Sequence, residues 1–118
     1  MTATAPAVAE VEAISLGELY DKLQRRDIFL LVMAMDEPRF EKAHIEGSTS
    51  WDSLQTTLDR TDRDAEIIVY CTGPDCAASK LRAAALVARG FTNVRRFAGG
   101  LTEWNQAGLP IVEWAPAA

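Results

Sequence analysis

The chain has 118 residues, of which 48% are hydrophobic and 25% charged, and its formal net charge is −5. This length fits one domain, and the composition is that of a folded protein rather than a disordered or collagen-like chain. An acidic chain lacks the basic footprint that nucleic-acid binding needs, and no apolar run approaches the roughly 20 residues of a membrane span. We therefore expect a single domain with neither nucleic acid nor a membrane among its partners.

The two ends of the chain differ from the middle in composition. Residues 1–10 and 115–118 are rich in Ala and Pro, and we expect both to be flexible segments around one domain at 11–114. The first ten residues hold no Lys or Arg and no apolar stretch of signal-peptide length, which predicts a cytoplasmic protein. In that reducing compartment, a pair of cysteines such as Cys71 and Cys76 is more often reactive or metal-binding than structural.

The first half of the chain predicts alternating helices and strands. Ser15 and Glu18 have the spacing of a capping box, in which each side chain satisfies a free N–H at a helix start. The apolar run at 28–33 suits a strand buried on both faces, and Asp52 is the expected N-cap of a later helix. The predicted elements here are a helix at 15–26, a strand at 28–33, a helical turn at 38–43, a short strand at 48–51 and a helix at 52–60.

The second half contains the strongest strand signal, the β-branched and aromatic run E-I-I-V-Y-C at 66–71. An Ala- and Leu-rich helix follows the turn residues at 72–75. Gly90 is expected to end this helix in a left-handed conformation, which lets Phe91 pack back on Leu86. The remaining predictions are a helix at 77–89, a strand at 94–97, a helix at 101–107 that stops at Gly108, and an extended segment at 111–113.

This alternation of strands and helices predicts an α/β fold, with a parallel sheet covered by helices on both faces. Ligands of such folds bind at the carboxyl ends of the strands. Cys71 ends the strongest predicted strand and comes just before the strongest predicted helix. The expected active position therefore coincides with a cysteine.

Cys71 is the predicted nucleophile. A loop that enters a helix presents unpaired backbone N–H groups and the positive end of the helix dipole, which stabilise a thiolate and lower the pKa of the thiol. Gly73 is expected to let these N–H groups face inward. The alternative is that Cys71 is only a small apolar residue at the end of a buried strand. The predicted binding loop consists of Thr72, Gly73, Pro74, Asp75, Cys76 and Ala77.

Several segments, in this order and spacing, resemble a single rhodanese-like sulfurtransferase domain. The segment F-E-K-A-H-I-E-G at 40–47 is similar to the family's E-F-x-x-G-H-I-P-G-A, and I-I-V-Y-C at 67–71 is similar to the strand before its cysteine. G-F-T-N-V at 90–94 resembles G-F-x-N-V. G-G-L-T-E-W at 99–104, with A-G-L-P at 107–110, resembles G-G-x-x-x-W-x-x-A-G-x-P.

The resemblance implies a three-layer sandwich around a central parallel sheet of about five strands. It also implies that Cys71 attacks the sulfane sulfur of thiosulfate or a persulfide and becomes a cysteine persulfide, while sulfite or a thiolate leaves. A thiophile such as cyanide, glutathione or a protein thiol then takes the sulfur. Neither a cofactor nor a metal is expected.

Two departures from the family pattern bear on the donor. Many relatives read Asp-Val-Arg where this chain has Met-Ala-Met at 33–35, and many carry a cation in the cysteine loop where this chain has Asp75. A carboxylate beside an anion site predicts weaker binding of thiosulfate. Lys80 and Arg82 either compensate or point to solvent.

Cys76 is a possible resolving thiol, since it could form a disulfide with an oxidised or persulfidated Cys71; the alternative is a small residue packed in the first helical turn. Cys76 and Arg82 also match the C-x5-R spacing of phosphatase loops, but the residues between them predict a helix rather than a phosphate loop. Three functions therefore stay open: a sulfurtransferase, a non-catalytic sulfur-relay or binding module, and a Cys71–Cys76 redox sensor.

Other polar and aromatic residues are expected to be structural. His44 is the only histidine, and we expect it to orient a loop by hydrogen bonding rather than to bind metal. Arg95 and Arg96 could steer anions, but a solvated pair on a short strand is the preferred interpretation. Trp51, Trp104 and Trp114 are expected to cover the core.

Overall fold

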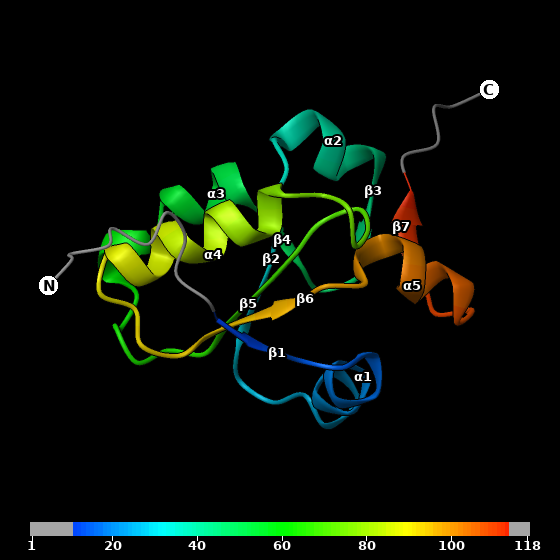
Figure 1. Cartoon of the computed structure of the whole chain (residues 1–118), viewed down its shortest axis with the longest axis horizontal. Coiled ribbons are helices and arrows are strands. Elements are labelled where there is room, and N and C mark those ends of the chain that lie inside the picture. Colours follow the sequence, from blue (N-terminus) through cyan, green and yellow to red (C-terminus); the bar gives the residue numbers. More distant parts are fainter. Residues whose placement is uncertain (1–10, 114–118) are drawn as a thin grey trace, which may run out of the picture.

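The computed structural model describes residues 11–113 and shows a central sheet of five strands (Figure 1). All four strand pairs in this sheet are parallel, and the strand order is β1-β6-β5-β2-β4. The five strands are β1 (Glu12–Ala13), β2 (Leu30–Met33), β4 (Thr49–Ser50), β5 (Ile67–Tyr70) and β6 (Val94–Phe97). A second, two-stranded sheet pairs β3 (Ala43–Ile45) antiparallel with β7 (Ile111–Glu113). The predicted flexible ends at 1–10 and 115–118, and Trp114, lie outside the described residues.

Helices cover both faces of the central sheet. α3 and α4 lie together on one side of it, and α1 lies on the other (Figure 1). The helices are α1 (Leu16–Arg25), α2 (Glu37–Lys42), α3 (Trp51–Gln55), α4 (Ala78–Ala88) and α5 (Gly100–Gln106), with a 3-10 turn η1 (Leu58–Arg60). The predicted α/β sandwich with a parallel sheet is thereby confirmed. Within residues 11–113, no helix has both the length and the apolar character that crossing a bilayer requires.

β5 shows why its sequence is apolar without interruption. Ile67 and Val69 pack in one buried cluster with α3 and α4, while Ile68 and Tyr70 pack in a second cluster with α1 and α5. Successive side chains of a strand point to opposite faces, so a strand between two helical layers needs apolar residues at every position. β5 is also the middle strand of the five. The residue that follows it therefore lies at the centre of the carboxyl edge.

The structure corrects the start of the second predicted strand. Ile28 is 98% exposed, and pairing with β5 begins only at Leu30. The cause lies at the end of α1, where Arg26 adopts a left-handed conformation with φ 57° and turns the chain. Ile28 therefore precedes the sheet and has no strand beside it.

The helix predicted at 52–60 is also different. Ser50, not Asp52, is the N-cap, because the Ser50 hydroxyl accepts the N–H of Ser53 at 3.0 Å. The hydroxyls of Thr56 and Thr57 donate to carbonyls one turn earlier, at 2.7 and 3.2 Å. Such side-chain bonds compete with helical backbone bonds. The segment is consequently broken into α3 and the separate turn η1.

The N-cap of α1 is confirmed in part. The Ser15 hydroxyl accepts the backbone N–H of Glu18 at 3.1 Å, as predicted. The Glu18 carboxylate, however, accepts from Arg95 Nη2 at 2.9 Å. The reciprocal half of the capping box is replaced by an ion pair between α1 and β6.

Candidate active site

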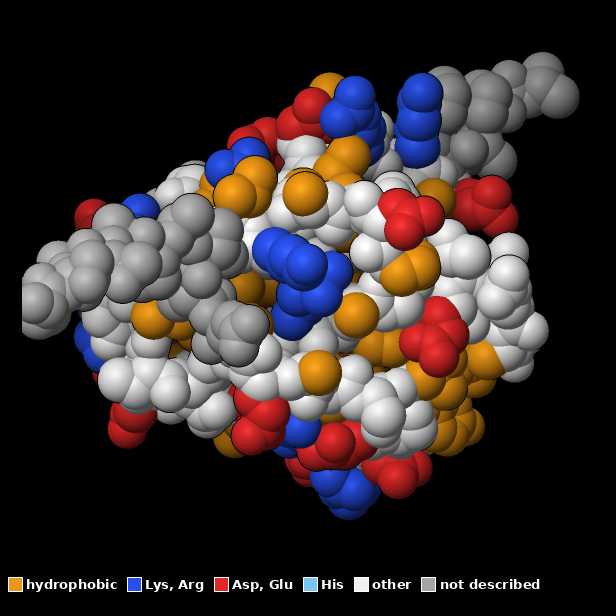
Figure 2. Space-filling model, in the orientation of Figure 1, with side chains coloured by type: hydrophobic (Ala, Val, Ile, Leu, Met, Phe, Trp, Pro, Cys, Tyr) orange, Lys and Arg blue, Asp and Glu red, His pale blue; other side chains and the backbone are white. Residues whose placement is uncertain are grey.

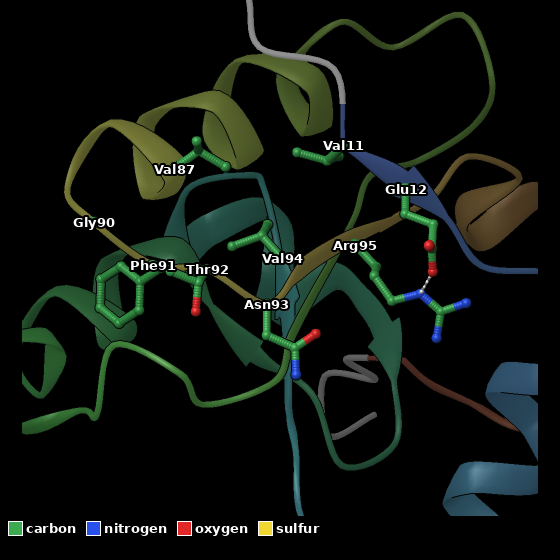
Figure 3. Close-up of a pocket in the computed structure, with 9 residues that line it drawn as sticks. All are labelled: Val11, Glu12, Val87, Gly90, Phe91, Thr92, Asn93, Val94 and Arg95. Carbon is green, nitrogen blue, oxygen red and sulfur yellow. Dashed lines mark ion pairs between the residues drawn. The ribbon is translucent and has the colours of Figure 1, made fainter.

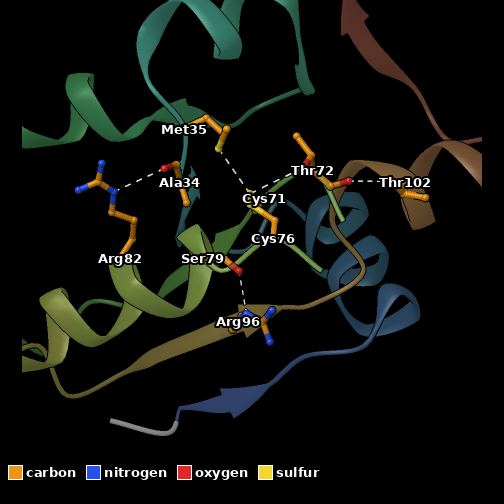
Figure 4. The surroundings of a disulfide bond; sticks show 9 residues. All are labelled: Ala34, Met35, Cys71, Thr72, Cys76, Ser79, Arg82, Arg96 and Thr102. Carbon is orange, nitrogen blue, oxygen red and sulfur yellow. Dashed lines mark hydrogen bonds between the residues drawn. A yellow bond between two sulfur atoms is a disulfide. The ribbon is translucent and has the colours of Figure 1, made fainter. Parts of the chain in front are cut away.

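Cys71 follows β5 directly and is 1% exposed, at the carboxyl edge of the central sheet. Its sulfur forms a disulfide with half-buried Cys76, and the two Cα atoms are 6.3 Å apart (Figure 4). That separation lies within the range that disulfides ordinarily span. The structure thus joins the two predicted thiols in an oxidised state. A thiolate at Cys71 is a property of the reduced protein.

The loop between the cysteines turns sharply. The backbone N–H of Cys76 donates to the carbonyl of Gly73 at 3.2 Å and closes a turn. This N–H is therefore not free to hold an anion. Within residues 11–113, the backbone N–H groups without an acceptor in this loop are those of Thr72, Gly73, Asp75 and Ala77. α4 begins at the next residue, and no side chain caps its N-terminus.

The start of α5 fixes the first part of the loop. The N–H of Leu101 donates to the carbonyl of Cys71 at 3.0 Å, and the N–H and hydroxyl of Thr102 both donate to the carbonyl of Thr72, at 2.9 and 2.8 Å. Gly100 precedes these donors with a φ of +59°, and a Cβ built on it would lie 2.3 Å from the carbonyl oxygen of Cys71. Only glycine allows this close approach. The sequence analysis quoted this glycine within G-G-L-T-E-W but missed the contact.

Gly73 lies close to the start of α5. Its φ is not among the positive values, so its backbone conformation is open to other residues. A Cβ at Gly73 would lie 3.1 Å from the hydroxyl oxygen of Thr102. Glycine is therefore favoured here by the space that α5 leaves, rather than by an unusual backbone turn.

The sulfur of Cys71 lies against a second sulfur. Met35 Sδ is 3.5 Å from Cys71 Sγ, and the hydroxyl oxygen of Thr72 is 3.9 Å from it (Figure 4). In the disulfide Cys71 carries no proton, so the contact with Met35 is a van der Waals contact between polarisable atoms. Met35 stands where many relatives carry the arginine of Asp-Val-Arg. On this side the sulfur therefore meets a thioether rather than a cation.

The cations expected near the loop are engaged elsewhere or exposed. The guanidinium of Arg82 lies 4.8 Å from the centre of the Trp51 ring, and its Nε donates to the carbonyl of Ala34 at 3.5 Å. Lys80 is exposed. Arg82 neither compensates for Asp75 at the cysteines nor points freely into solvent, because the aromatic ring and the carbonyl hold it.

The prediction that Arg95 and Arg96 form a solvated pair is wrong. The side chain of Arg95 is only 14% exposed, and it makes ion pairs with three carboxylates, at 3.1 Å to Glu12, 2.9 Å to Glu18 and 3.9 Å to Glu66. Arg96 Nε donates to the hydroxyl of Ser79 at 2.7 Å. Ser79 is 1% exposed and belongs to the first turn of α4. Arg96 therefore ties β6 to the helix that follows the cysteines, a link that the sequence did not reveal.

His44 and two of the tryptophans have the structural roles expected of them. His44 Nδ1 lies 2.7 Å from the carbonyl oxygen of Phe40, and the two rings stack with their centres 3.8 Å apart. Trp51 and Trp104 are buried at 9% and 3% exposure. Among residues 11–113, no three His, Cys, Asp or Glu side chains gather where they could hold a metal ion.

Tyr70, the last residue of β5, forms a buried hydrogen-bond network that the sequence analysis missed. Its hydroxyl oxygen accepts the N–H of Ile45 at 2.9 Å and lies 2.7 Å from the Ser48 hydroxyl. Ser48 donates its own proton to the carbonyl of Ile45 at 2.6 Å, so the Tyr70 hydroxyl donates to Ser48. Burial raises the pKa of Tyr70 to about 12. The network joins the strand before Cys71 to β3.

We predict that Tyr70→Phe lowers the free energy of unfolding by about 1–3 kcal/mol at pH 7, because the N–H of Ile45 is left buried without a partner. The wild-type protein should also lose stability as pH rises from about 10 to about 12, because the folded state holds the phenol proton above the pH at which the unfolded chain releases it. Between pH 9 and 11 that loss is about 1 kcal/mol. Urea unfolding of both proteins at pH 7, 9 and 11 checks this. An equal loss in wild type and variant above pH 9 contradicts it.

Two hollows formed by residues 11–113 lie on the surface, and neither Cys71 nor Cys76 lines them. One of about 540 Å³ lies between β1, β6 and the end of α4, where Val11, Val87 and Val94 face one another (Figure 3). It opens at the amino ends of the parallel strands, away from the edge at which such folds bind ligands. A smaller hollow of about 380 Å³ reaches the cysteine loop, where Thr72 and Thr102 line it together with Asn105. Acidic and basic side chains are interspersed over the face shown in Figure 2.

The sequence of this chain is similar to a known family of domains and to a known protein. A family model described as Rhodanese-like domain matches residues 15–107. The chain is 30% identical over 109 residues to the HTH-type transcriptional regulator Rv0324 of Mycobacterium tuberculosis; the match covers 89% of this chain and 46% of that protein, so this chain spans about half the length of its relative.

Solved structures share the fold. The thiosulfate sulfurtransferase from Pseudomonas aeruginosa superposes with a TM-score of 0.73 and 22% identity, over 87% of this chain and 20% of that one. The polysulfide-sulfur transferase homodimer from Wolinella succinogenes superposes with a TM-score of 0.65 and 21% identity, over 89% of this chain and 80% of that one.

Proposed function

This chain belongs to the rhodanese-like domain family, and from that membership and the geometry of its site we propose that it is a sulfurtransferase in which Cys71 carries sulfane sulfur as a cysteine persulfide. The observation that carries the proposal is the position of Cys71. It ends the middle strand of a parallel sheet, at the entrance to α4, in a loop that retains several unbonded backbone N–H groups. This combination supports a stabilised thiolate once the disulfide is reduced.

The reaction proceeds in two displacements at sulfur. The Cys71 thiolate attacks the sulfane sulfur of the donor; a new S–S bond forms, the donor's S–S bond breaks, and sulfite or a thiolate leaves with the electron pair. An acceptor thiolate or cyanide then attacks the outer sulfur and releases Cys71 as a thiolate. Backbone N–H groups of the loop and the uncapped N-terminus of α4 stabilise negative charge in both steps.

The surroundings of Cys71 favour a persulfide or polysulfide donor over thiosulfate. A dianionic sulfonate needs a cation at close range, but Arg82 is held by Trp51, Asp75 lies in the loop, and the sulfur faces the thioether of Met35. The likeness of fold does not choose between the donors, since it extends both to a thiosulfate sulfurtransferase and to a polysulfide-sulfur transferase. The proposed sulfur acceptor is cyanide or a small or protein thiol.

Sulfur loading of the Cys76→Ser variant tests the proposal, since this variant cannot form the disulfide. We expect incubation with glutathione persulfide to add about 32 Da, mapped to the peptide of Cys71, and cyanide or a thiol to remove that mass with turnover. Thiosulfate should load the same variant more slowly. Absence of the added mass with every donor contradicts a sulfurtransferase, whereas loading without turnover indicates a sulfur-relay module.

A second candidate is a redox sensor, favoured by the disulfide itself. A relative named as a transcriptional regulator supports a sensing role, although this chain spans only 46% of that protein. In a sensor, mild oxidant alone removes about 2 Da from the reduced protein as the disulfide forms, and no sulfur donor changes its mass. Sulfur loading of Cys71 in the Cys76→Ser variant, which cannot form the disulfide, separates the two candidates.

A further inference from the structure

We propose that Cys76 turns the persulfide of Cys71 into hydrosulfide, so that this domain reduces sulfane sulfur to sulfide at the expense of its own two thiols. The inference rests on the proposed persulfide at Cys71. It goes further in naming an acceptor within the same chain, a product, and a thiol reductant as the second substrate.

The step balances without an external oxidant. The Cys76 thiolate attacks Cys71 Sγ, the inner sulfur of the persulfide; the Cys71–Cys76 bond forms and the bond between the two persulfide sulfurs breaks. The outer sulfur leaves as hydrosulfide with the electron pair. Two thiol sulfurs are thereby oxidised to a disulfide, and one sulfane sulfur is reduced to sulfide.

The fold brings the attacking sulfur to the inner sulfur. The disulfide between the two cysteines forms without breaking the hydrogen bonds around the loop. The bonds from α5 to the carbonyls of Cys71 and Thr72 are present together with it. The turn closed by the N–H of Cys76 and the carbonyl of Gly73 returns the chain toward β5. A sulfur held within bonding reach outcompetes a dilute external acceptor, because its effective concentration is far higher.

The two cysteines differ in burial, and this difference determines which sulfur of the disulfide an incoming thiolate attacks. Cys71 is 1% exposed, whereas Cys76 is half-buried in a loop whose neighbours Pro74 and Asp75 are exposed. An incoming thiolate therefore reaches Cys76 Sγ first and forms a mixed disulfide there. Cys71 leaves as the thiolate, which is the form that accepts the next sulfur. A second thiol then frees Cys76, so each cycle consumes one dithiol or two monothiols.

Benzenethiosulfonate tests this step, because it donates sulfane sulfur, leaves as sulfinate and introduces no thiol. Reduced and desalted wild type, Cys76→Ser and Cys71→Ser proteins are mixed with it under argon. Hydrosulfide is trapped with monobromobimane, and intact masses are recorded. We expect wild type to release about one equivalent of hydrosulfide and to lose about 2 Da, Cys76→Ser to gain about 32 Da without a burst, and Cys71→Ser to do neither.

The outcomes separate this step from the proposed function. If Cys76→Ser is loaded but wild type keeps the added sulfur, whether on Cys71 or passed to Cys76, hydrosulfide release is overturned and sulfur transfer stands. If Cys76→Ser takes up no sulfur, the proposed function fails and this step fails with it.

A separate experiment tests the return path from the disulfide to the two thiols. When a dithiol is added to wild type together with the sulfur donor, we expect repeated release of hydrosulfide. Release of a single equivalent despite excess dithiol contradicts the proposed return path.

Discussion

Cys71→Ser is expected to lower sulfur loading and sulfurtransferase turnover by about a thousandfold or more, since a serine hydroxyl is not ionised at neutral pH and cannot take over the attack of a thiolate. The loop N–H groups and the N-terminus of α4 stay in place, so the loss reflects the missing nucleophile. Stopped assays with glutathione persulfide and cyanide, together with intact mass, measure it.

The matched control is Cys76→Ser, which changes the same atom five residues later. It should keep loading, because Cys76 is not the first nucleophile. Thermal unfolding of the reduced proteins by circular dichroism shows whether both variants fold. Comparable loading in the two variants contradicts the assignment of Cys71, and loss in Cys76→Ser alone reverses the roles of the two cysteines.

Gly100→Ala is expected to damage both the fold and the site. Its Cβ would meet three backbone atoms, at 2.3 Å the oxygen of Cys71, at 2.9 Å the carbon of Cys71 and at 3.0 Å the nitrogen of Gly73, and backbone cannot rotate away as a side chain can. The left-handed φ of +59° adds its own cost for a residue with a Cβ. Together these predict a loss of about 2–5 kcal/mol in the free energy of unfolding, measured in urea, and slow sulfur loading.

Gly108→Ala separates the two causes. Gly108 also has a positive φ, +77°, but a Cβ there would meet nothing within 4 Å. This control should cost about 1–2 kcal/mol and leave sulfur loading unchanged. If Gly100→Ala behaves like Gly108→Ala in both measurements, the close approach of α5 to the cysteine loop is unimportant.

Most of the fold could be predicted because its strongest signals are local. The run at 66–71 became β5, since a middle strand covered on both faces must be apolar throughout. The end of α4 was also predicted: Gly90 has a φ of +97°, and the N–H of Phe91 donates to the carbonyl of Leu86 at 3.2 Å. These features depend on neighbours in the sequence, which a single chain displays.

The elements that were missed depend on distant partners. β1 has two residues and exists only through its pairing with Arg95 and Arg96 of β6. β3 pairs His44 with Val112 of β7, which lies nearly seventy positions further along the chain. Three residues are too few to show the alternation of apolar and polar side chains from which a strand is predicted. A local pattern carries no information about such pairings.

The candidate site also has a part that could be predicted from the local sequence and a part that depends on distant residues. Cys71 and Cys76 were identified from their place between a strand and a helix, and the resemblance reinforced the choice. The contacts that shape the site come from elsewhere: Met35 from the end of β2, Gly100 from the start of α5, and Arg96 from β6. The sequence analysis singled out the segments that hold these residues, but the contacts that they make are visible only in the folded chain.

The two backbone bonds from α5 to the carbonyls of Cys71 and Thr72 have a consequence for synthesis. A ribosome exposes both thiols before residues 100–102 have emerged, so the newly made loop is without its final support. Thiol reactivity in nascent chains of increasing length should change when this segment leaves the exit tunnel. The cysteine loop thus gains these two bonds only after residues 100–102 have left the tunnel, and alkylation of stalled chains can time that event.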